Sequence, residues 1–428
     1  MQADPNGEQL VRDSFTAALA AGQPGPITAT AYAWLHRPPT AVLALGKAAG
    51  AMAKAVRDAG YTGPGLVITT DENHRQIAGF DCFASAHPVP DERGLVAATA
   101  VERMVLGLGA DDHLLLLISG GGSALLPAPA EGISLGQKIA LNDALLASGL
   151  DIHAMNVVRR LFSRLKGGQL ARLAAPAAIT QFLLSDVPSD LPQSIASGPA
   201  VADPVPFEDA LVMIRKHHLD RLDFIAPHLD AIKAGKIAGP VRPGDPVLAN
   251  VKTHILASNA QCRDAAESYI RRSLPRGECL KGPALDGEAS QMAVKLAAQI
   301  IDHCQLGGER PYVLVTGGET TVTLDPAKPG KGGRSQELAL AFAAAMQAAE
   351  TKAPRNWVIL AGGTDGRDGP TDAAGGVVAS SQTFDRDAAL AALASHNSYG
   401  YLKAHNQLLI VGATGTNLAD LVVIYAQP

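Results

Sequence analysis

The chain has 428 residues, of which 47% are hydrophobic and 18% are charged. One hydrophobic core rarely supports more than about 250–300 residues, so this length predicts two domains. The composition is typical of a globular protein and excludes extended disorder. The formal net charge of -5 excludes a general basic surface for nucleic acid, and any recognition of anions must therefore be local.

The N-terminal segment, MQADPNGEQL, lacks the basic and apolar parts of a signal peptide, and no stretch reaches the ~18 apolar residues of a membrane span. The cysteines are widely spaced and form no CxxC pair, as expected of reduced thiols. We therefore expect a cytoplasmic protein that binds neither membranes nor nucleic acid.

Short aliphatic runs of strand length recur along the chain, and many of them end in glycine-rich turns that open a helical stretch. In the first half, strands are expected over 41–45, 65–69, 114–118 and 179–184. In the second half, they are expected over 254–257, 312–315, 357–360, 408–411 and 421–425. This alternation of strands and long helical stretches predicts an α/β fold with a largely parallel sheet and crossover helices.

The segment 239–246, GPVRPGDP, is rich in proline and glycine and interrupts the alternation of strands and helices. Such composition favours a domain boundary, so we expect an N-terminal domain over 1–245 and a C-terminal domain over 246–428. A surface loop within one domain is the alternative interpretation.

The glycine-rich turn in LLLLISGGGSALL is the most informative feature. A strand ends there, and the chain turns into a helix through Ser119, Gly120, Gly121, Gly122 and Ser123. Glycines let successive N–H groups point into one concavity, which binds phosphate or carboxylate at a helix start. The loop matches no dinucleotide or hydrolase-elbow pattern, because Leu125 stands where the last glycine is needed, and the Walker A pattern occurs nowhere in the chain. A tight turn without a ligand is the alternative.

Basic residues at three other places could add to an anion site. Lys47 follows Gly46 at an expected helix start, where a cation opposes the helix dipole unless an anion is bound. Asn156 and Arg159 share one face of a helix expected over 151–168, as bidentate anion recognition requires. Arg334 lies in the glycine-rich run KPGKGGRSQEL and could clamp a phosphate. Solvent-exposed charges are the alternative in each case.

Acidic residues follow several expected strands. They are Asp186 and Asp190 in SDVPSD, Glu319 in TGGETT, and Asp365, Asp368 and Asp372 in GGTDGRDGPTDAAGG. Any one of them is most often a turn residue that bonds its own backbone. Together they suit phosphoryl transfer, which needs a metal to neutralise phosphate charge and a group to orient the acceptor hydroxyl.

The chain resembles the MOFRL-family glycerate 2-kinases, also called class II glycerate kinases. The resemblance covers positions from about 40 to 425 and rests on segments in family order: ALGKAAGAMA, AHPVPDERG, ISGGGSALL, HAMNVVRRLFSRLKGGQLA, LSDVPSD with IASGPAVADP, TGGETTVTL, KGGRSQEL, GGTDGRDGPTDAAGG and VGATGTNLADL. It implies a Rossmann-like three-layer N-terminal domain and a smaller α/β C-terminal MOFRL domain. It also implies phosphorylation of D-glycerate by ATP at the 2-hydroxyl, giving 2-phosphoglycerate, with Mg²⁺ or another divalent cation.

The resemblance also implies roles for the residues above. Lys47 and Arg334 match basic positions that act on the substrate and the transferring phosphoryl group. Asp186 or Asp190 would orient the acceptor hydroxyl, and Asp365 would help to hold the metal. Substrate or ATP would be bound by the loop 119–123, Asn156, Arg159, Glu319, Thr320 and Thr364. The oligomeric state stays open, with a homodimer among the expected assemblies.

The chain departs from the family pattern at Ser189 and Leu191, at Ser335 and Asn397, and at Ala413. Two other functions therefore stay in view. A hydroxypyruvate reductase would need a nicotinamide site, but the GxGxxG fingerprint and the acidic residue ~20 positions later are missing. The other alternative is a non-catalytic sensor of sugar acids or nucleotides. It is supported by Asn397, which stands where the family has an aspartate.

Overall fold

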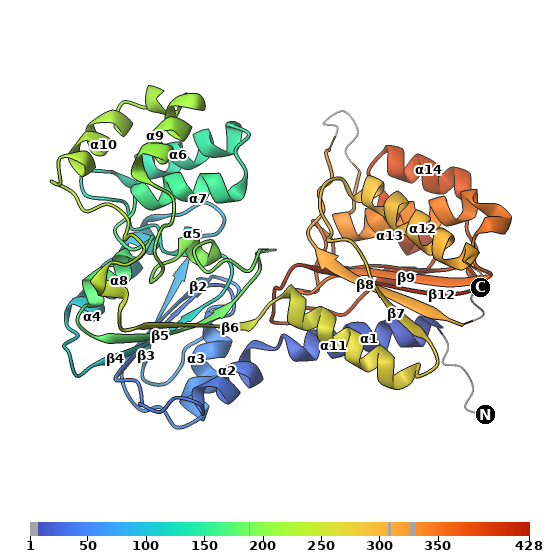
Figure 1. Ribbon diagram of the computed structural model, residues 1–428, viewed down its shortest axis with the longest axis horizontal. Helices are drawn as coiled ribbons and strands as arrows, with labels where there is room; N and C mark the ends of the chain where they lie inside the picture. Colours follow the sequence, from blue (N-terminus) through green and yellow to red (C-terminus); the bar gives the residue numbers. More distant parts are fainter. Residues whose placement is uncertain (1–6, 188, 307–309, 325–329) are drawn as a thin grey trace. The chain divides into compact units, whose positions relative to one another are not determined.

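A computed structural model of the protein describes residues 7–187, 189–306, 310–324 and 330–428 (Figure 1). Contacts within the chain group it into two compact units. We call Pro24–Leu256 the N-terminal unit, and the residues up to Gln23 together with Ala257–Pro428 the C-terminal unit. Within the described ranges, no helix is both long and apolar enough to cross a membrane.

The N-terminal unit is built on a six-stranded sheet in the order β3-β2-β1-β4-β5-β6. Its strands are β1 (Ala41–Leu45), β2 (Gly65–Thr70), β3 (Phe80–Ser85), β4 (His113–Ile118), β5 (Ala178–Leu184) and β6 (Val251–Ala257). Its helices are α2 (Pro24–Tyr32), α3 (Ala49–Asp58), α4 (Glu92–Leu106), α5 (Gly122–Leu125), α6 (Leu135–Ala147), α7 (Ile152–Leu161), α8 (Gln169–Ala174), α9 (Phe207–Lys216) and α10 (Ile225–Lys233). Short 3-10 turns lie at η1 (Ile195–Ser197), η2 (Leu219–Arg221) and η3 (Pro246–Leu248).

The pairs β3–β2, β2–β1, β1–β4 and β4–β5 are all parallel. Every residue of β1, β2 and β4 is buried, as expected of parallel strands covered on both faces. Helices α4 and α8 pack their aliphatic residues onto the sheet, and α3 packs against β1 and β2. The predicted α/β class is confirmed.

The strand order places a topological switch point between β1 and β4. These strands are neighbours in register Leu45↔Ile118, although β2 and β3 lie between them in the chain. Connections therefore leave β1 and β4 in opposite directions, which opens a crevice at their carboxyl ends where α/β folds bind ligands. The loops that begin at Gly46 and Ser119 are the two loops at this crevice.

Helices α6, α7, α9 and α10 gather beside one end of this sheet (Figure 1). They share a separate apolar core that includes Leu141, Leu145, Phe162 and Ile214. Helix α7 ends at Leu161, so the predicted helix over 151–168 is too long. The chain leaves the helix because its next residues pair with 128–130: Ser163 forms a β-bridge with Pro129, and Arg164 donates to the carbonyl oxygen of Ala128.

The C-terminal unit contains a second six-stranded sheet, in the order β11-β10-β9-β12-β8-β7. Its strands are β7 (Glu278–Lys281), β8 (Tyr312–Gly318), β9 (Asn356–Gly363), β10 (Gly375–Ala379), β11 (Leu408–Leu409) and β12 (Asp420–Gln427). Its helices are α1 (Gly7–Ala21), α11 (Asn259–Ser273), α12 (Ala289–Gln305), α13 (Arg334–Ala348), α14 (Arg386–Ala394) and α15 (Ser398–Ala404), with a 3-10 turn at η4 (Glu350–Lys352).

This second sheet is mixed, which corrects the expectation of parallel pairing in the second half of the chain. Strand β12 is antiparallel to both of its neighbours, β8 and β9, while β7 and β8 are parallel. No crossover helix lies between β11 and β12, so the chain end can enter the middle of the sheet in the opposite direction.

The N-terminal unit ends at Leu256, whereas the sequence predicts a domain boundary after residue 245. The segment 239–246 is bound inside the N-terminal unit, where Gln169 donates to the carbonyl oxygens of Ala238 and Gly239. Strand β6 then adds to the same sheet, next to β5. At the other end, α1 packs against α11 and β12 of the C-terminal unit. A Pro/Gly-rich segment alone does not distinguish these arrangements.

Candidate functional site

The loops after β1 and β4 are joined by hydrogen bonds. The backbone N–H of Lys47 donates to the carbonyl oxygen of Gly120 over 2.9 Å. The backbone N–H of Ala48 donates to Ser119 Oγ, also over 2.9 Å. Gly46 has φ of +121°, and a Cβ there would lie 2.3 Å from Ser119 Oγ. The sequence motif therefore folds into a two-loop unit that only glycine permits at this contact.

Two further glycines are required by close neighbours. A Cβ at Gly120 would lie 2.0 Å from Asp186 Oδ2, and a Cβ at Gly122 would lie 2.8 Å from the Cβ of Ala196. Gly121 has φ of +85° and precedes α5. Because α5 is only one turn long, its dipole adds little positive charge, contrary to the expectation for a helix start. Side chains must supply most of the charge that an anion would meet.

Lys47 and His87 flank the glycine loop. A Cβ at Gly121 would lie 3.3 Å from Lys47 Cγ and 3.2 Å from His87 Cδ2. Burial lowers the pKa of His87, and the charge of Lys47 lowers it further, while Glu72 raises it. His87 is therefore a neutral ring beside the half-buried lysine.

The two aspartates predicted after β5 occupy different surroundings. Asp186 lies against Gly120, as the short distance from its Oδ2 to a Cβ at that glycine shows. Asp190 is a turn residue with φ of +50°, and its backbone N–H donates to the carbonyl oxygen of Val187. Of the pair, Asp186 is the one brought to the glycine loop.

A chain of polar contacts runs from the glycine loop to α7. Ser123 Oγ lies 2.7 Å from Ser197 Oγ, which donates to Asn156 Oδ1 over 3.2 Å. Arg159 donates to the same Asn156 oxygen over 3.4 Å and to Asn142 Oδ1 over 2.6 Å. Ser197 has φ of +59°, a conformation that side-chain-bearing residues adopt mainly where function or packing holds it. Asn156 and Arg159 are thus connected to the glycine loop.

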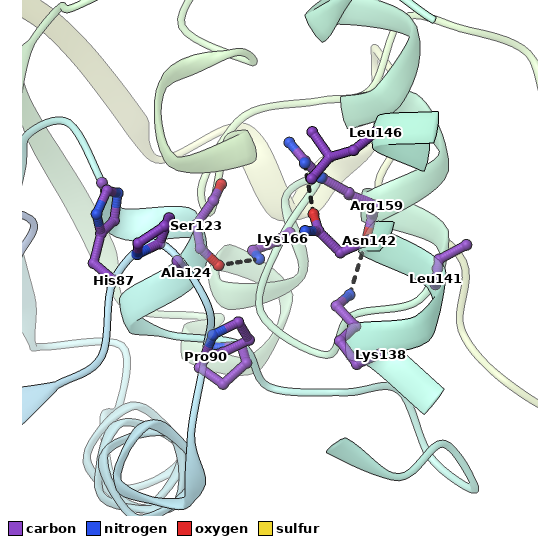
Figure 2. Close-up of a pocket in the computed structure, with 13 residues that line it drawn as sticks. His87, Pro90, Ser123, Ala124, Lys138, Leu141, Asn142, Leu146, Arg159 and Lys166 are labelled. Carbon is purple, nitrogen blue, oxygen red and sulfur yellow. Dashed lines mark hydrogen bonds between the residues drawn. The ribbon is translucent and has the colours of Figure 1, made fainter. Parts of the chain in front are cut away.

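Of these residues, Ser123, Asn142 and Arg159 border a cavity of ≈ 250 Å³ between the glycine loop and helices α6 and α7. Figure 2 shows Ser123 and His87 on one side of it and Asn142 and Arg159 on the other. Sequence reasoning missed Asn142, Ser197, Lys138 and Lys166. The signal for Lys166 was its place before the Gly167–Gly168 pair, whereas Lys138 looks like any lysine on an amphipathic helix.

The predicted residues of the C-terminal unit centre on Arg334, the first residue of α13. Its Nη2 donates to Asp420 Oδ1 over 3.1 Å, its Nε donates to Asp420 Oδ2, and its Nη1 donates to Glu319 Oε1. Burial acts to lower the pKa of Arg334, but Asp420 and Glu319 raise it overall. Glu319 and Asp420 follow β8 and begin β12, which pair side by side. The structure therefore unites Arg334 with Glu319 and adds Asp420, which the sequence did not single out.

Asp368 holds the start of the same helix. Its two carboxylate oxygens accept the backbone N–H groups of Ser335 and Gln336 over 3.1 and 2.7 Å. Burial raises the pKa of Asp368 to about 7, against the opposing effect of these hydrogen bonds. Asp368 is a helix-capping residue beneath Arg334.

The remaining predicted residues make local bonds. Thr364 is buried and bonds Ala419 and Leu418 through its hydroxyl, and Thr320 is also buried. Asp365 accepts the backbone N–H of Arg367, as in an Asx turn. Across the described parts of the chain, no group of three or more His, Cys, Asp or Glu side chains is arranged to hold a metal ion.

The paired loops lie at a switch point in the parallel-sheet unit of a two-unit α/β protein. A family model described as the MOFRL family matches residues 312–420, and one described as a domain of unknown function (DUF4147) matches residues 10–230. A glycerate 2-kinase from Pyrococcus horikoshii is 36% identical, over 89% of this chain and 86% of its own length. A D-glycerate 2-kinase from Thermotoga maritima is 35% identical, over 89% of each.

A solved glycerate kinase from Thermotoga maritima matches the structure with a TM-score of 0.87 at 33% identity, covering 98% of this chain and 99% of the other. A relative from Agrobacterium vitis, 38% identical over 98% of this chain and 95% of its own length, carries the provisional name of hydroxypyruvate reductase. The chain belongs to the MOFRL-containing glycerate 2-kinase family, which confirms the resemblance found in its motifs.

Proposed function

We propose that the protein is a cytoplasmic kinase that transfers the γ-phosphoryl group of ATP to the 2-hydroxyl of D-glycerate, giving 2-phosphoglycerate. The observation that carries the proposal is the position of a cation and a carboxylate on the same glycine loop. Lys47 lies beside Gly121, and Asp186 lies beside Gly120. Relatives named glycerate 2-kinase support the choice of acceptor.

Phosphoryl transfer is catalysed mainly by positioning and by stabilising charge on the transferring group. Lys47 supplies a positive charge at the crevice, and the loop N–H groups after Ser119 would donate to an anionic oxygen, while the Ser119 N–H donates to Leu45. Asp186 accepts a hydrogen bond from the acceptor hydroxyl and so orients it for attack on the γ-phosphorus. The attacking oxygen gives its proton to the Asp186 carboxylate as the new O–P bond forms, and the bond between the γ-phosphorus and the β-phosphate oxygen breaks to release ADP.

Arg334 is the cation proposed from the C-terminal unit. Its guanidinium is fixed in orientation by Asp420 and Glu319, which limits the entropy lost when it meets an anion. We propose that Arg334 stabilises the transferring phosphoryl group, with Glu319 holding its Nη1 in place. Thr320 and Thr364 support the loops that carry these residues.

A divalent cation would neutralise charge on the phosphates of ATP. Mg²⁺ needs only one or two protein carboxylates, because waters and phosphate oxygens complete its shell. Asp365 is the metal ligand proposed from its motif, and a single carboxylate meets this need, which leaves Asp186 to the acceptor hydroxyl. Asp190 serves in the turn that carries Asp186.

Initial rates separate the proposed kinase from the reductase. The protein with ATP, Mg²⁺ and D-glycerate should release ADP, and omission of D-glycerate should abolish the release. Hydroxypyruvate with NADH or NADPH should give no oxidation of the nucleotide, because the turn after β1 reads Gly46-Lys47-Ala48-Ala49-Gly50 and lacks the dinucleotide fingerprint. Oxidation of NADH or NADPH without release of ADP would identify a reductase instead.

A further inference from the structure

The cavity between the glycine loop and helices α6 and α7 contains two buried lysines. Lys138 lies on α6 and is 7% exposed, and Lys166 precedes α8 and is 4% exposed. The Lys138 ammonium donates to the carbonyl oxygens of Phe162 over 2.6 Å and Arg159 over 3.2 Å. The Lys166 ammonium donates to the carbonyl oxygen of Ser123 over 2.6 Å (Figure 2). Each lysine still has donor capacity, since an ammonium carries three N–H groups.

Within the described residues, no carboxylate is paired with either lysine. None of the ion pairs found among the described residues involves Lys138, Arg159 or Lys166. Burial, followed by repulsion from Arg159, lowers the pKa of Lys166 to about 7. Burial, followed by repulsion from Lys166 and Arg159, lowers the pKa of Lys138 well below its usual range. A buried cation without a counter-charge is costly, so the cluster favours an anion in the cavity.

The neighbouring residue Arg160 shows how this fold treats a buried cation with a structural role. Arg160 is 3% exposed, and its Nη2 donates to the carboxylate of Asp203 over 2.9 Å. Arg159, the next residue along α7, points its guanidinium at the amide oxygens of Asn142 and Asn156 instead. The contrast indicates that the missing counter-charge on the cavity side comes from a ligand.

The size and lining of the cavity limit that ligand. Its ≈ 250 Å³ lies below the roughly 300–1,000 Å³ of sites for drug-sized molecules, so it suits a small acid better than a nucleoside triphosphate. Leu141, Pro90 and Pro127 form an apolar part of the wall that would not solvate a polyphosphate. Arg159 provides the planar donor pair that matches a carboxylate, and Asn142 and Ser123 can bond hydroxyl groups.

We propose that this cavity binds the carboxylate of the hydroxy-acid substrate, with Lys138, Arg159 and Lys166 as its counter-charges. The inference rests on the proposed kinase activity and places the hydroxy acid beside the glycine loop 119–123. Gly121, Ser123 and His87 line the same cavity, so the acid would extend from the lysines toward the loop that Lys47 and Asp186 flank. Lys47 is then left to act on the transferring phosphoryl group.

The test replaces Lys166 with methionine, which keeps the buried stem and removes the charge, and repeats this at Lys138. Calorimetry measures binding of D-glycerate without ATP, and steady-state kinetics measure KM for D-glycerate and for ATP. Each variant should lower the affinity for D-glycerate by about 10- to 100-fold, because one charged hydrogen bond is lost. KM for ATP should stay within about twofold of the wild-type value. Lys54→Met, at an exposed lysine paired with Asp58 on α3, should change neither.

Glyceramide, the uncharged amide of the same acid, isolates the charge effect. The wild type should bind D-glycerate more tightly than glyceramide, and Lys166→Met should lose most of that preference. The affinity of the wild type for D-glycerate should also fall between pH 6 and 8 as Lys166 loses its proton, and should fall less in the variant. The other groups facing the ligand are Lys138, Arg159 and His87, and all three are retained in Lys166→Met.

The outcomes separate this inference from the proposed activity. If the wild type releases ADP with D-glycerate but both lysine variants bind the acid unchanged, the inference is wrong and the activity stands. A rise in KM for ATP with an unchanged affinity for D-glycerate would assign the cavity to the phosphates and overturn the inference too. If the wild type binds D-glycerate and the variants do not, the cavity holds the acid even where ADP release fails.

Discussion

The side-chain oxygen of Ser119 accepts the backbone N–H of Ala48 over 2.9 Å, so the loop after β4 is tied to the loop after β1. This bond holds Lys47 next to the glycine loop at the switch point of the parallel sheet. The arrangement explains why glycines recur there, since a Cβ at Gly46 would meet Ser119 and one at Gly120 would meet Asp186. The predictions below test the chemistry that follows from these contacts.

Lys47→Ala should lower kcat by roughly 10²–10³-fold, because one preorganised charge-stabilising group is lost from the transition state. KM for D-glycerate should change little if Lys47 acts mainly on the transferring group. The thermal midpoint should stay near the wild-type value, since the lysine is only half-buried. Steady-state kinetics with Lys54→Ala as the control check this, and an unchanged kcat/KM in Lys47→Ala would reject the assignment.

Gly120→Ala should displace Asp186, because the added Cβ would lie 2.0 Å from its Oδ2. We expect kcat to fall by at least about tenfold, because a small displacement of a group that positions the substrate lowers the rate strongly. Gly25→Ala is the matched control, as nothing lies within 4 Å of a Cβ at that position in α2. Equal activity in the two variants would show that Asp186 does not orient the acceptor hydroxyl.

Arg334→Met should lower both kcat and stability. The variant leaves the buried carboxylate of Asp420 without its partner, at a cost of about 1–3 kcal/mol in the free energy of unfolding. The double variant Arg334→Met with Asp420→Asn should recover part of that stability and none of the kcat. Chemical denaturation and kinetics on the three proteins separate the two roles. Recovery of kcat together with stability would make Arg334 a structural residue only.

The stability of the C-terminal unit should depend on pH through Asp368. Burial raises the pKa of this carboxyl from 3.8 to about 7, so the folded protein keeps a proton that the unfolded chain loses. The free energy of unfolding should therefore fall as pH rises from about 4 to 7. In Asp368→Asn, the slope should be shallower by up to about 1.4 kcal/mol per pH unit.

Urea unfolding followed by the fluorescence of Trp357, in a Trp34→Phe background, reports on this unit alone. Asp372→Asn is the control, because the pKa of Asp372 is lowered by its hydrogen bond to Tyr399 and its removal should leave the falling slope in place. An identical slope in the wild type and Asp368→Asn would show that Asp368 does not titrate in this window.

The sequence predicted the parts of the fold that depend on local pattern. Aliphatic runs identified β1, β4 and β5, and the glycines of the loop 119–123 predicted the turn at the switch point. Strands β3, β7 and β10 were missed, since FDCFAS, ECLK and GGVVA lack a long aliphatic run. The antiparallel direction of β12 was also missed, because direction is set by pairing across the sheet.

In the candidate site too, the sequence predicted the residues that depend on local pattern and missed those that depend on the fold. Asn156 and Arg159 were found because helical spacing puts them on one face, and Arg334 was found from its glycine-rich setting. Asp420 and Ser197 were missed, since each reaches its partner only when distant segments pack together. Lys138 and Lys166 were missed because burial, which makes their charges unusual, is a property of the fold.

The position of the new phosphate tests the central claim most directly. The protein is incubated with ATP, Mg²⁺ and D-glycerate, and the product is passed to enolase, which forms phosphoenolpyruvate from 2-phosphoglycerate and not from 3-phosphoglycerate. The account predicts that 2-phosphoglycerate and phosphoenolpyruvate together equal the ADP released, and that phosphoenolpyruvate forms with no need for a phosphoglycerate mutase. Release of ADP with phosphoenolpyruvate only after addition of the mutase would contradict it.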